Sequence, residues 1–214
     1  MYSKQKRMVI HTALEIKQSG LISLSGGNVS MRMPNGHILI TPSGTSYETM
    51  RERDVVVVDS KGNRIEGKLR ESVDTVALLY IYEHMPKVNA IIHTHQPYAT
   101  AVGLLGDVFP AAVTTLANVT LGEVNVAPYC SAASLDMGVQ TVNYIGERRA
   151  VILKHHGVIT IGKDLKEALY AAVYMEDAAK TYLAAKAAGE PAIMTQEQTQ
   201  DAVNIHKTYG QQHK

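Results

Sequence analysis

Short apolar runs typical of strands alternate with segments of helical periodicity, and this alternation constrains the fold more than any other feature of the chain. Strands are expected at 29–33, 37–41, 55–59, 88–92, 150–153 and 158–161, and helices at 4–19, 73–85, 97–105, 135–145, 165–188 and 196–207. Helix 165–188 has the clearest ends, because Asp164 and Glu167 have capping-box spacing and Gly189 follows. Interspersed strands and helices favour an α/β protein whose sheet is covered by helices.

The composition favours one globular domain and excludes several classes of protein. The sequence has no repeat, no linker rich in Pro, Gly or Ser, and no block of like charge, so residues 1–214 are expected to form a single domain. Apolar residues make up 45% of the chain, which allows a sizeable core. With 21 Lys and Arg against 20 Asp and Glu, the net charge is only +1, which argues against an extended nucleic-acid surface.

Cysteine content and apolar run length bear on location. Cys130 is the only cysteine, so no disulfide can form within the chain. No apolar run reaches the roughly 18 to 20 residues that span a bilayer. We expect a protein of the cytoplasm with no membrane partner.

Two histidine clusters follow predicted strands and suggest a metal site. His93 and His95 are two residues apart at the end of 88–92, so their side chains can point to one face. His156 follows 150–153 and precedes Gly157, where a tight turn is favourable. Three histidines with an open fourth position are a common arrangement for catalytic zinc. The alternative for either cluster is chance or a pair of histidines hydrogen-bonded in the core.

Asp74 is the acidic residue expected to accompany this site. It lies in the first turn of helix 73–85, for which Ser72 is a plausible N-cap. The positive end of the helix would stabilise its carboxylate and make the neighbourhood suitable for an anion. The alternative is an ordinary aspartate at a helix start.

Five short motifs, in this order, resemble the class II aldolase/adducin family. They are Gly26-Gly27-Asn28-Val29-Ser30, Ile40-Thr41-Pro42-Ser43-Gly44, Ser72-Val73-Asp74-Thr75, His93-Thr94-His95 and His155-His156-Gly157. The resemblance covers essentially the whole chain. It implies a three-layer α/β/α fold with a central, largely antiparallel sheet, and a metal-dependent aldehyde-lyase.

The resemblance also implies roles for individual residues. Zinc would be bound by His93, His95 and His156, with His155 as a non-ligand. Asp74 takes the acidic position that the family's aldolases fill with a glutamate base and its 4-epimerases with a metal-binding aspartate. Tyr209 would act as a phenol donor. The substrate phosphate would be held by Gly27, Asn28, Ser43, Gly44 and Ser72.

Three positions depart from the family pattern. Val73 replaces the second of two adjacent serines and Glu71 replaces a proline, so phosphate binding should be weakened. Asn118 stands where the epimerases have an acid/base aspartate, and an amide cannot transfer the proton. A tyrosine that the aldolases place near Thr114 is absent.

The function expected from the resemblance is cleavage of a small phosphorylated ketose, of the L-fuculose 1-phosphate type. Cleavage of the carbon–carbon bond would release a short aldehyde and a metal-bound enediolate, and protonation of the enediolate would give dihydroxyacetone phosphate. The alternatives are epimerisation of L-ribulose 5-phosphate, decarboxylation of a phosphorylated keto acid, and a non-catalytic adducin-like interaction module. The family also implies a homotetramer with active sites at the subunit interfaces.

Overall fold

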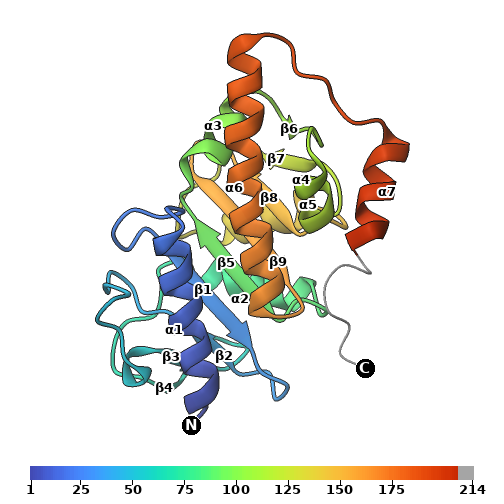
Figure 1. Cartoon of the computed structure of the whole chain (residues 1–214). Helices are drawn as coiled ribbons and strands as arrows, with labels where there is room; N and C mark the ends of the chain where they lie inside the picture. The colour runs from blue at the N-terminus through green and yellow to red at the C-terminus, as the bar shows by residue number, and fades with distance from the viewer. Residues whose placement is uncertain (207–214) are drawn as a thin grey trace.

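The computed structural model describes residues 1–206, which contain a nine-stranded sheet (Figure 1). The strand order is β4-β3-β2-β1-β5-β9-β8-β7-β6. The strands are β1 (Gly27–Arg32), β2 (Ile38–Ile40), β3 (Val56–Val58), β4 (Arg64–Glu66), β5 (Ala90–Thr94), β6 (Val108–Phe109), β7 (Val124–Ala127), β8 (Ala150–Leu153) and β9 (Gly157–Gly162). Neighbouring strands are antiparallel except β7 and β8, which are parallel, so the largely antiparallel sheet is confirmed.

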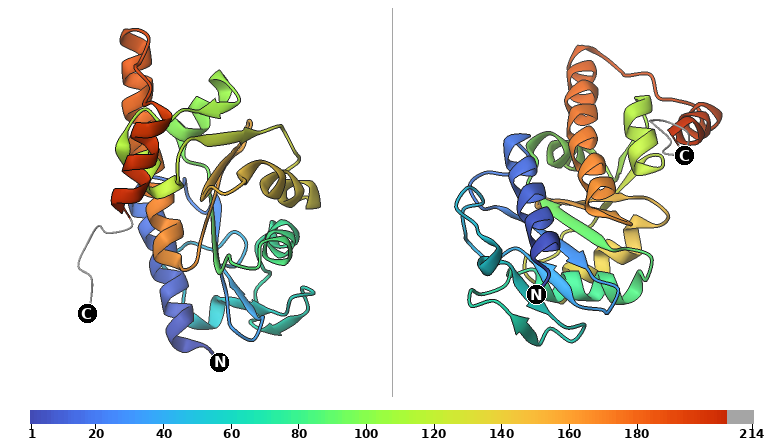
Figure 2. Two further views of the ribbon diagram at one scale, coloured as in Figure 1. Left: turned by 90° about the vertical axis from the view of Figure 1, so that its right-hand side faces the viewer. Right: turned by 60° about the horizontal axis from the view of Figure 1, so that its bottom comes forward.

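Helices cover both faces of the sheet and complete three layers (Figure 2, left). They are α1 (Ser3–Gln18), η1 (Glu52–Asp54), α2 (Thr75–His84), α3 (Pro97–Leu105), α4 (Thr114–Thr120), α5 (Leu135–Ile145), α6 (Leu165–Ala188) and α7 (Gln196–His206). Helices α2 and α5 pack together on one face. Helices α1, α3, α4 and α6 lie on the other, and α7 packs on α4.

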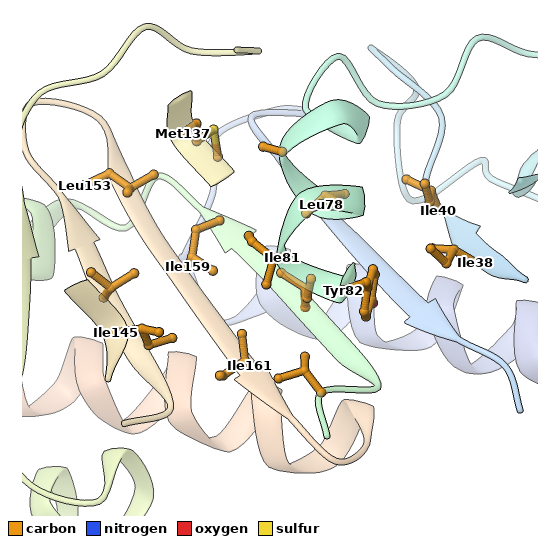
Figure 3. Close-up of a cluster of buried hydrophobic side chains, with 14 of the residues drawn as sticks. Ile38, Ile40, Leu78, Ile81, Tyr82, Met137, Ile145, Leu153, Ile159 and Ile161 are labelled. Atoms are coloured by element: carbon orange, nitrogen blue, oxygen red, sulfur yellow. The ribbon is translucent and has the colours of Figure 1, made fainter. Parts of the chain in front are cut away.

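Apolar side chains from both faces of the sheet build the core. On one side, Ile38 of β2 and Ile159 of β9 join Ile81 of α2 and Met137 of α5 in one cluster (Figure 3). On the other side, α1 and the start of α6 cover β1, β2, β3 and β5. Each fully buried side chain of this size contributes about 1.5–3 kcal/mol, so the packing holds the strand ends in a fixed relation.

Helices α3, α5 and α6 have the bounds predicted from the sequence. The cap of α6 is confirmed, because Asp164 Oδ1 accepts the N–H of Glu167 at 2.8 Å. Helix α1 also forms, one residue earlier at each end than expected, and α7 begins at Gln196 as expected, with its predicted end at 207 lying outside the described residues. Strands β4, β6 and β7 and helix α4 were not predicted, since they are short and their apolar residues show no clear periodicity.

Helix α2 begins later than predicted, and the difference concerns the site. Ser72 Oγ accepts the N–H of Asp74 at 3.3 Å, and Thr75 Oγ1 donates to the Ser72 carbonyl at 2.6 Å. This turn leaves Asp74 just outside the helix, at its N-cap position but without a capping side-chain hydrogen bond. Its carboxylate is therefore free to point away from the helix.

No helix within residues 1–206 is long and apolar enough to cross a membrane. The end of β5, the β8–β9 turn and the start of β1 meet in the middle of the sheet, because β1 and β9 flank β5. The predicted site residues on these three segments are thereby brought together.

Candidate metal centre and its surroundings

Three histidine side chains converge where β5 ends and the β8–β9 turn begins. His93 belongs to β5, His95 follows that strand, and His156 lies in the turn. The ring centroids are 4.9 Å apart for His93 and His95, 4.8 Å for His93 and His156, and 5.0 Å for His95 and His156. One nitrogen of each ring lies within 4.8 Å of the others, so the three side chains could hold a metal ion.

His93 is oriented by the sheet. Its Nδ1 lies 2.9 Å from the Val158 carbonyl oxygen, which can only accept, so Nδ1 carries the proton and Nε2 keeps its lone pair. That Nε2 lies 3.1 Å from Nε2 of His95. Burial, helped by the charges of His156 and His95, lowers the pKa of His93 to about 3. His93 is thus a neutral imidazole with its free nitrogen directed at the cluster.

The other two histidines lie closer to solvent. His95 is exposed and His156 half-buried. Partial burial lowers the pKa of both imidazoles, while the charge of Asp74 opposes the shift. Nδ1 of His156 is buried and has no hydrogen-bond partner among the described residues. Neutral imidazoles with an orphaned nitrogen fit a metal ion.

Two backbone features direct His156 toward the cluster. A Cβ on Gly157 would overlap the carbonyl oxygen of Thr94 and come within 3.1 Å of the His95 ring, so β9 can approach β5 only with glycine there. The preceding residue, His155, has a left-handed φ of 61°. The ring centroids of His155 and Tyr129 are 6.5 Å apart, and His155 lies outside the group of three histidines.

Asp74 is a buried carboxylate, 7% exposed. Its Oδ2 accepts from Asn28 Nδ2 at 2.8 Å, and its Oδ1 accepts from the N–H of Ala133 at 3.2 Å, a contact that the sequence did not suggest. Burial raises its pKa, and the charge of His156 and these two hydrogen bonds act against that rise. Among the described residues, Asp74 is not in the group of three side chains whose ligand atoms converge.

The glycine-rich turn runs beside the histidine strand because β1 pairs with β5. Gly27 is opposite Thr94 and Asn28 is opposite His93. A Cβ on Gly27 would lie 2.6 Å from the His93 carbonyl oxygen, so this position requires glycine. The buried Tyr47 donates its hydroxyl to the Gly27 carbonyl at 2.7 Å and fixes the turn. Sequence reasoning missed this tyrosine, for which no motif gives a signal.

The predicted phosphate residues come from three turns: Gly27 and Asn28, Ser43 and Gly44, and Ser72. The second and third turns are held together by a bridge between Pro42 and Glu71 and by the N–H of Ser43, which donates to the Arg70 carbonyl at 2.9 Å. Gly44 has a left-handed φ of 63° and open space where a side chain would stand. Ser72 is buried and Ser43 half-buried.

Two of the departures from the family pattern lie in this third turn. Glu71 is paired with Arg64, whose Nη2 is 2.7 Å from its carboxylate. A backbone hydrogen bond and this pairing lower the pKa of Glu71, so its charge is present but compensated. Val73 is 46% exposed and supplies no hydroxyl. The electrostatic objection to a phosphate is thus weaker than the sequence implied, and the missing hydrogen bond remains.

Two further residues singled out in the sequence lie elsewhere. Thr114 and Asn118 are on α4, where they line a cavity of about 480 Å³ with Met194 and with residues of α7. The lining of this cavity includes none of the three histidines. Tyr209, the expected phenol donor, lies outside the described residues.

Comparison with known proteins identifies the family. Residues 7–183 match the model of the class II aldolase and adducin N-terminal domain. The chain belongs to this family. It is 32% identical to L-fuculose phosphate aldolase of Escherichia coli K12 over 209 residues, 97% of this chain and 96% of the relative. The family resemblance seen in the sequence is therefore confirmed. These relatives also support the expected enzyme class, an aldolase lyase.

Solved structures confirm the expected fold. L-fuculose 1-phosphate aldolase superposes with a TM-score of 0.91 at 30% identity, covering 96% of this chain and 97% of that one. YgbL of Escherichia coli, a putative aldolase/epimerase/decarboxylase, gives 0.84 at 21% identity, covering 94% and 98%. At that identity the second likeness bears on the fold alone.

Proposed function

We propose that this protein is a zinc-dependent aldolase that cleaves a small phosphorylated ketose of the L-fuculose 1-phosphate type. The products would be dihydroxyacetone phosphate and a short aldehyde. The observation that carries the proposal is the convergence of three neutral histidines beside the buried carboxyl group of Asp74. The near full-length likeness to L-fuculose phosphate aldolase supports the choice of substrate.

Zinc would be held by His93, His95 and His156. When bound, it would act as a Lewis acid on the substrate carbonyl. The hydrogen bond from His93 to the Val158 carbonyl fixes the ring and its tautomer, which is the usual way a ligand is pre-oriented.

Asp74 would be the proton-transfer group. In the condensation direction it takes the proton from the hydroxymethylene carbon of the triose, and in cleavage it returns that proton to the same carbon. Asn28 and the N–H of Ala133 hold its two oxygens apart from the helix. Tyr209 would exchange a proton with the aldehyde oxygen.

The phosphate would be held by the turns that carry Gly27, Asn28, Ser43, Gly44 and Ser72. Backbone N–H groups and hydroxyls in such turns suit an anion without a basic surface. The compensated charge of Glu71 supports this assignment. We further propose that residues 1–214 form one domain and that the protein is cytoplasmic. We also propose that it is a homotetramer with its active sites at the subunit contacts. Light scattering can test the number of subunits.

Epimerisation of L-ribulose 5-phosphate is the second candidate, because an aspartate at position 74 matches the epimerases better than the aldolases. Asn118 argues against it, since that position would have to transfer a proton. The two reactions share the metal site and differ in product.

The deciding experiment offers each sugar phosphate to the zinc-loaded protein. Release of dihydroxyacetone phosphate from L-fuculose 1-phosphate supports the aldolase, and D-xylulose 5-phosphate as sole product from L-ribulose 5-phosphate supports the epimerase. Asp74→Asn should keep its zinc but lose turnover by about 10²- to 10⁴-fold, the usual contribution of a general acid or base. Full activity in chelator-treated, metal-free protein would contradict the proposal.

A further inference from the structure

His95 lies in a linker of two residues between β5 and α3. Within residues 1–206, its ring makes one hydrogen-bonding contact, and that contact is with another histidine of the cluster, His93. The position of His95 therefore depends on how the backbone on either side of it is held. The upstream side is strand β5, held by its ladders with β1 and β9, and the downstream side is held by helix α6.

Downstream of His95, the first turn of α3 is capped by a distant residue. Pro97 has no N–H, and the next two N–H groups, of Tyr98 and Ala99, donate to the two carboxylate oxygens of Glu176 at 3.0 and 2.9 Å. The N–H of Thr100 is the first to find a partner nearby, the carbonyl of Gln96 at 3.1 Å. Glu176 thus accepts both N–H groups that the start of the helix leaves free.

Gln96, on the linker itself, is fully buried. It stands at the N-cap position of α3, yet its side chain caps nothing. Its Oε1 accepts from Thr94 Oγ1 at 2.6 Å, and its Nε2 donates to the Ala172 carbonyl at 3.3 Å. Ala172 lies one turn before Glu176 on α6, so the same stretch of helix holds Gln96 and the start of α3, directly downstream of His95, and Gln96 in turn holds the Thr94 side chain upstream.

Glu176 is an unusual residue to bury. It is 2% exposed, and among the described residues it forms no ion pair with a lysine or arginine. A buried carboxylate without a cation partner costs stability, and burial accordingly raises its pKa. Two backbone N–H bonds compensate only in part. Stability alone therefore gives a weak reason for a carboxylate here, whereas accurate placement of the linker gives a strong one.

We propose that Glu176 and Gln96 are positioning residues for the metal site, which fix the linker so that His95 meets the other two ligands. The inference rests on the proposed function, because it requires that the three histidines bind metal. A carboxylate suits the task because it offers an acceptor to each N–H, whereas a glutamine would offer one oxygen and one opposed NH2 group.

The test compares Glu176→Gln with a matched control on the same helix, Glu167→Gln. Glu167 also accepts a backbone N–H, from Lys163 at 2.8 Å, and pairs with Arg149 at 2.6 Å, but its contacts are at the start of α6 and do not involve the linker. For each variant, zinc affinity is measured by chelator competition, and the ligand geometry is followed by the visible absorption of the Co²⁺-substituted protein. We expect Glu176→Gln to bind zinc about 10- to 100-fold more weakly with an altered Co²⁺ spectrum, as for other residues that orient ligands, and Glu167→Gln to match the wild type.

The outcomes separate the inference from the proposed function. Unchanged zinc affinity and spectrum in Glu176→Gln would overturn the inference, as would equal losses in both variants. A wild-type protein that binds neither metal at the histidines would instead overturn the proposed function. If Glu176→Gln does not fold, Gln96→Met removes the other half of the contact at similar volume, and it should show the same weakened zinc binding. Wild-type zinc affinity in Gln96→Met would then contradict the inference.

Discussion

The candidate site has two halves, the histidine cluster and the three turns proposed to hold the substrate phosphate, here called the phosphate turns. The two halves are built in different ways. The histidines stand on or beside strands, and the ladders and packing of those strands fix their backbone. The phosphate turns offer backbone N–H groups and hydroxyls, and one position that should carry a hydroxyl is Val73. A site made from side chains on a sheet is positioned by the fold, whereas a site made from turns is tuned by single side chains.

The largest effect is expected at the histidine cluster. His93→Ala should lower zinc affinity by more than about 100-fold, because even residues that only orient ligands contribute 10- to 100-fold, and turnover should fall to background. Metal content after dialysis reports the loss of zinc, and the rate of aldol cleavage reports the loss of turnover. His155→Asn is the control, since asparagine tolerates the left-handed backbone of that position and should keep the zinc. Tight zinc binding by His93→Ala would show that the ligands lie elsewhere.

The burial of the histidines can be tested through protons. Three imidazoles with the ordinary pKa of about 6.5 would together release about two protons on binding zinc at pH 6. Because the pKa of His93 is lowered to about 3, and those of His95 and His156 are also lowered, we expect far fewer to be released. Calorimetry in buffers of different ionisation enthalpy counts them.

The same shift has a consequence for the metal-free protein. As the pH falls below about 6.5, the unfolded chain takes up protons that native His93 does not bind. The free energy of unfolding should therefore decrease as the pH falls from about 6.5 toward 3, and above pH 6.5 it should keep the full contribution of His93. Release of two protons on zinc binding would contradict the burial argument. So would a free energy of unfolding that does not change between pH 6.5 and 3, as expected for a histidine that is exposed in the native state.

A smaller effect is expected at the phosphate turns. Arg64→Ala leaves the charge of Glu71 uncompensated, and a charge a few ångströms from the phosphate costs about 1 kcal/mol at the surface, or about fivefold in KM. The loss should shrink in high salt. Adding Glu71→Gln to that variant should restore KM. A KM that stays at the wild-type value in Arg64→Ala would remove Glu71 from the surroundings of the phosphate.

The smallest effect is expected from Val73→Ser, which supplies the missing hydroxyl. One neutral hydrogen bond contributes about 0.5–1.5 kcal/mol, so KM for the phosphorylated substrate should fall by up to about tenfold with kcat unchanged. Val76→Ser, at an exposed valine in the first turn of α2, three residues after Val73, is the matched control. Equal changes in the two variants would indicate an effect on the helix and not on phosphate.

Much of the fold could be predicted because strong local signals coincide with the elements. Helix α6 has its cap at Asp164 and its glycine at the end, whereas α4 and the short strands β4, β6 and β7 have neither periodicity nor clear boundaries. Propensity alone cannot find such elements, since tertiary packing determines them.

The candidate site divides in the same way. The histidine spacing on a strand predicted convergence, because side-chain direction follows from local geometry. Tyr47 and Ala133 act through hydrogen bonds between segments far apart in the sequence, which no local pattern encodes. Glu176 had one signal that was not used. It lies on the buried face of α6, with Ala172 and Ala179 four residues before it and three after it.

Gly157 carries a consequence for how this protein could change. The distance between the two ligand-bearing strands is set by an absent side chain, so any replacement there must push them apart, because its Cβ would lie 2.3 Å from the Thr94 carbonyl oxygen. Substitutions elsewhere can alter which sugar is accepted by small increments. At this position no intermediate spacing is available to selection or to a directed-evolution library, so we expect sequence libraries to retain glycine here whatever substrate they are selected for.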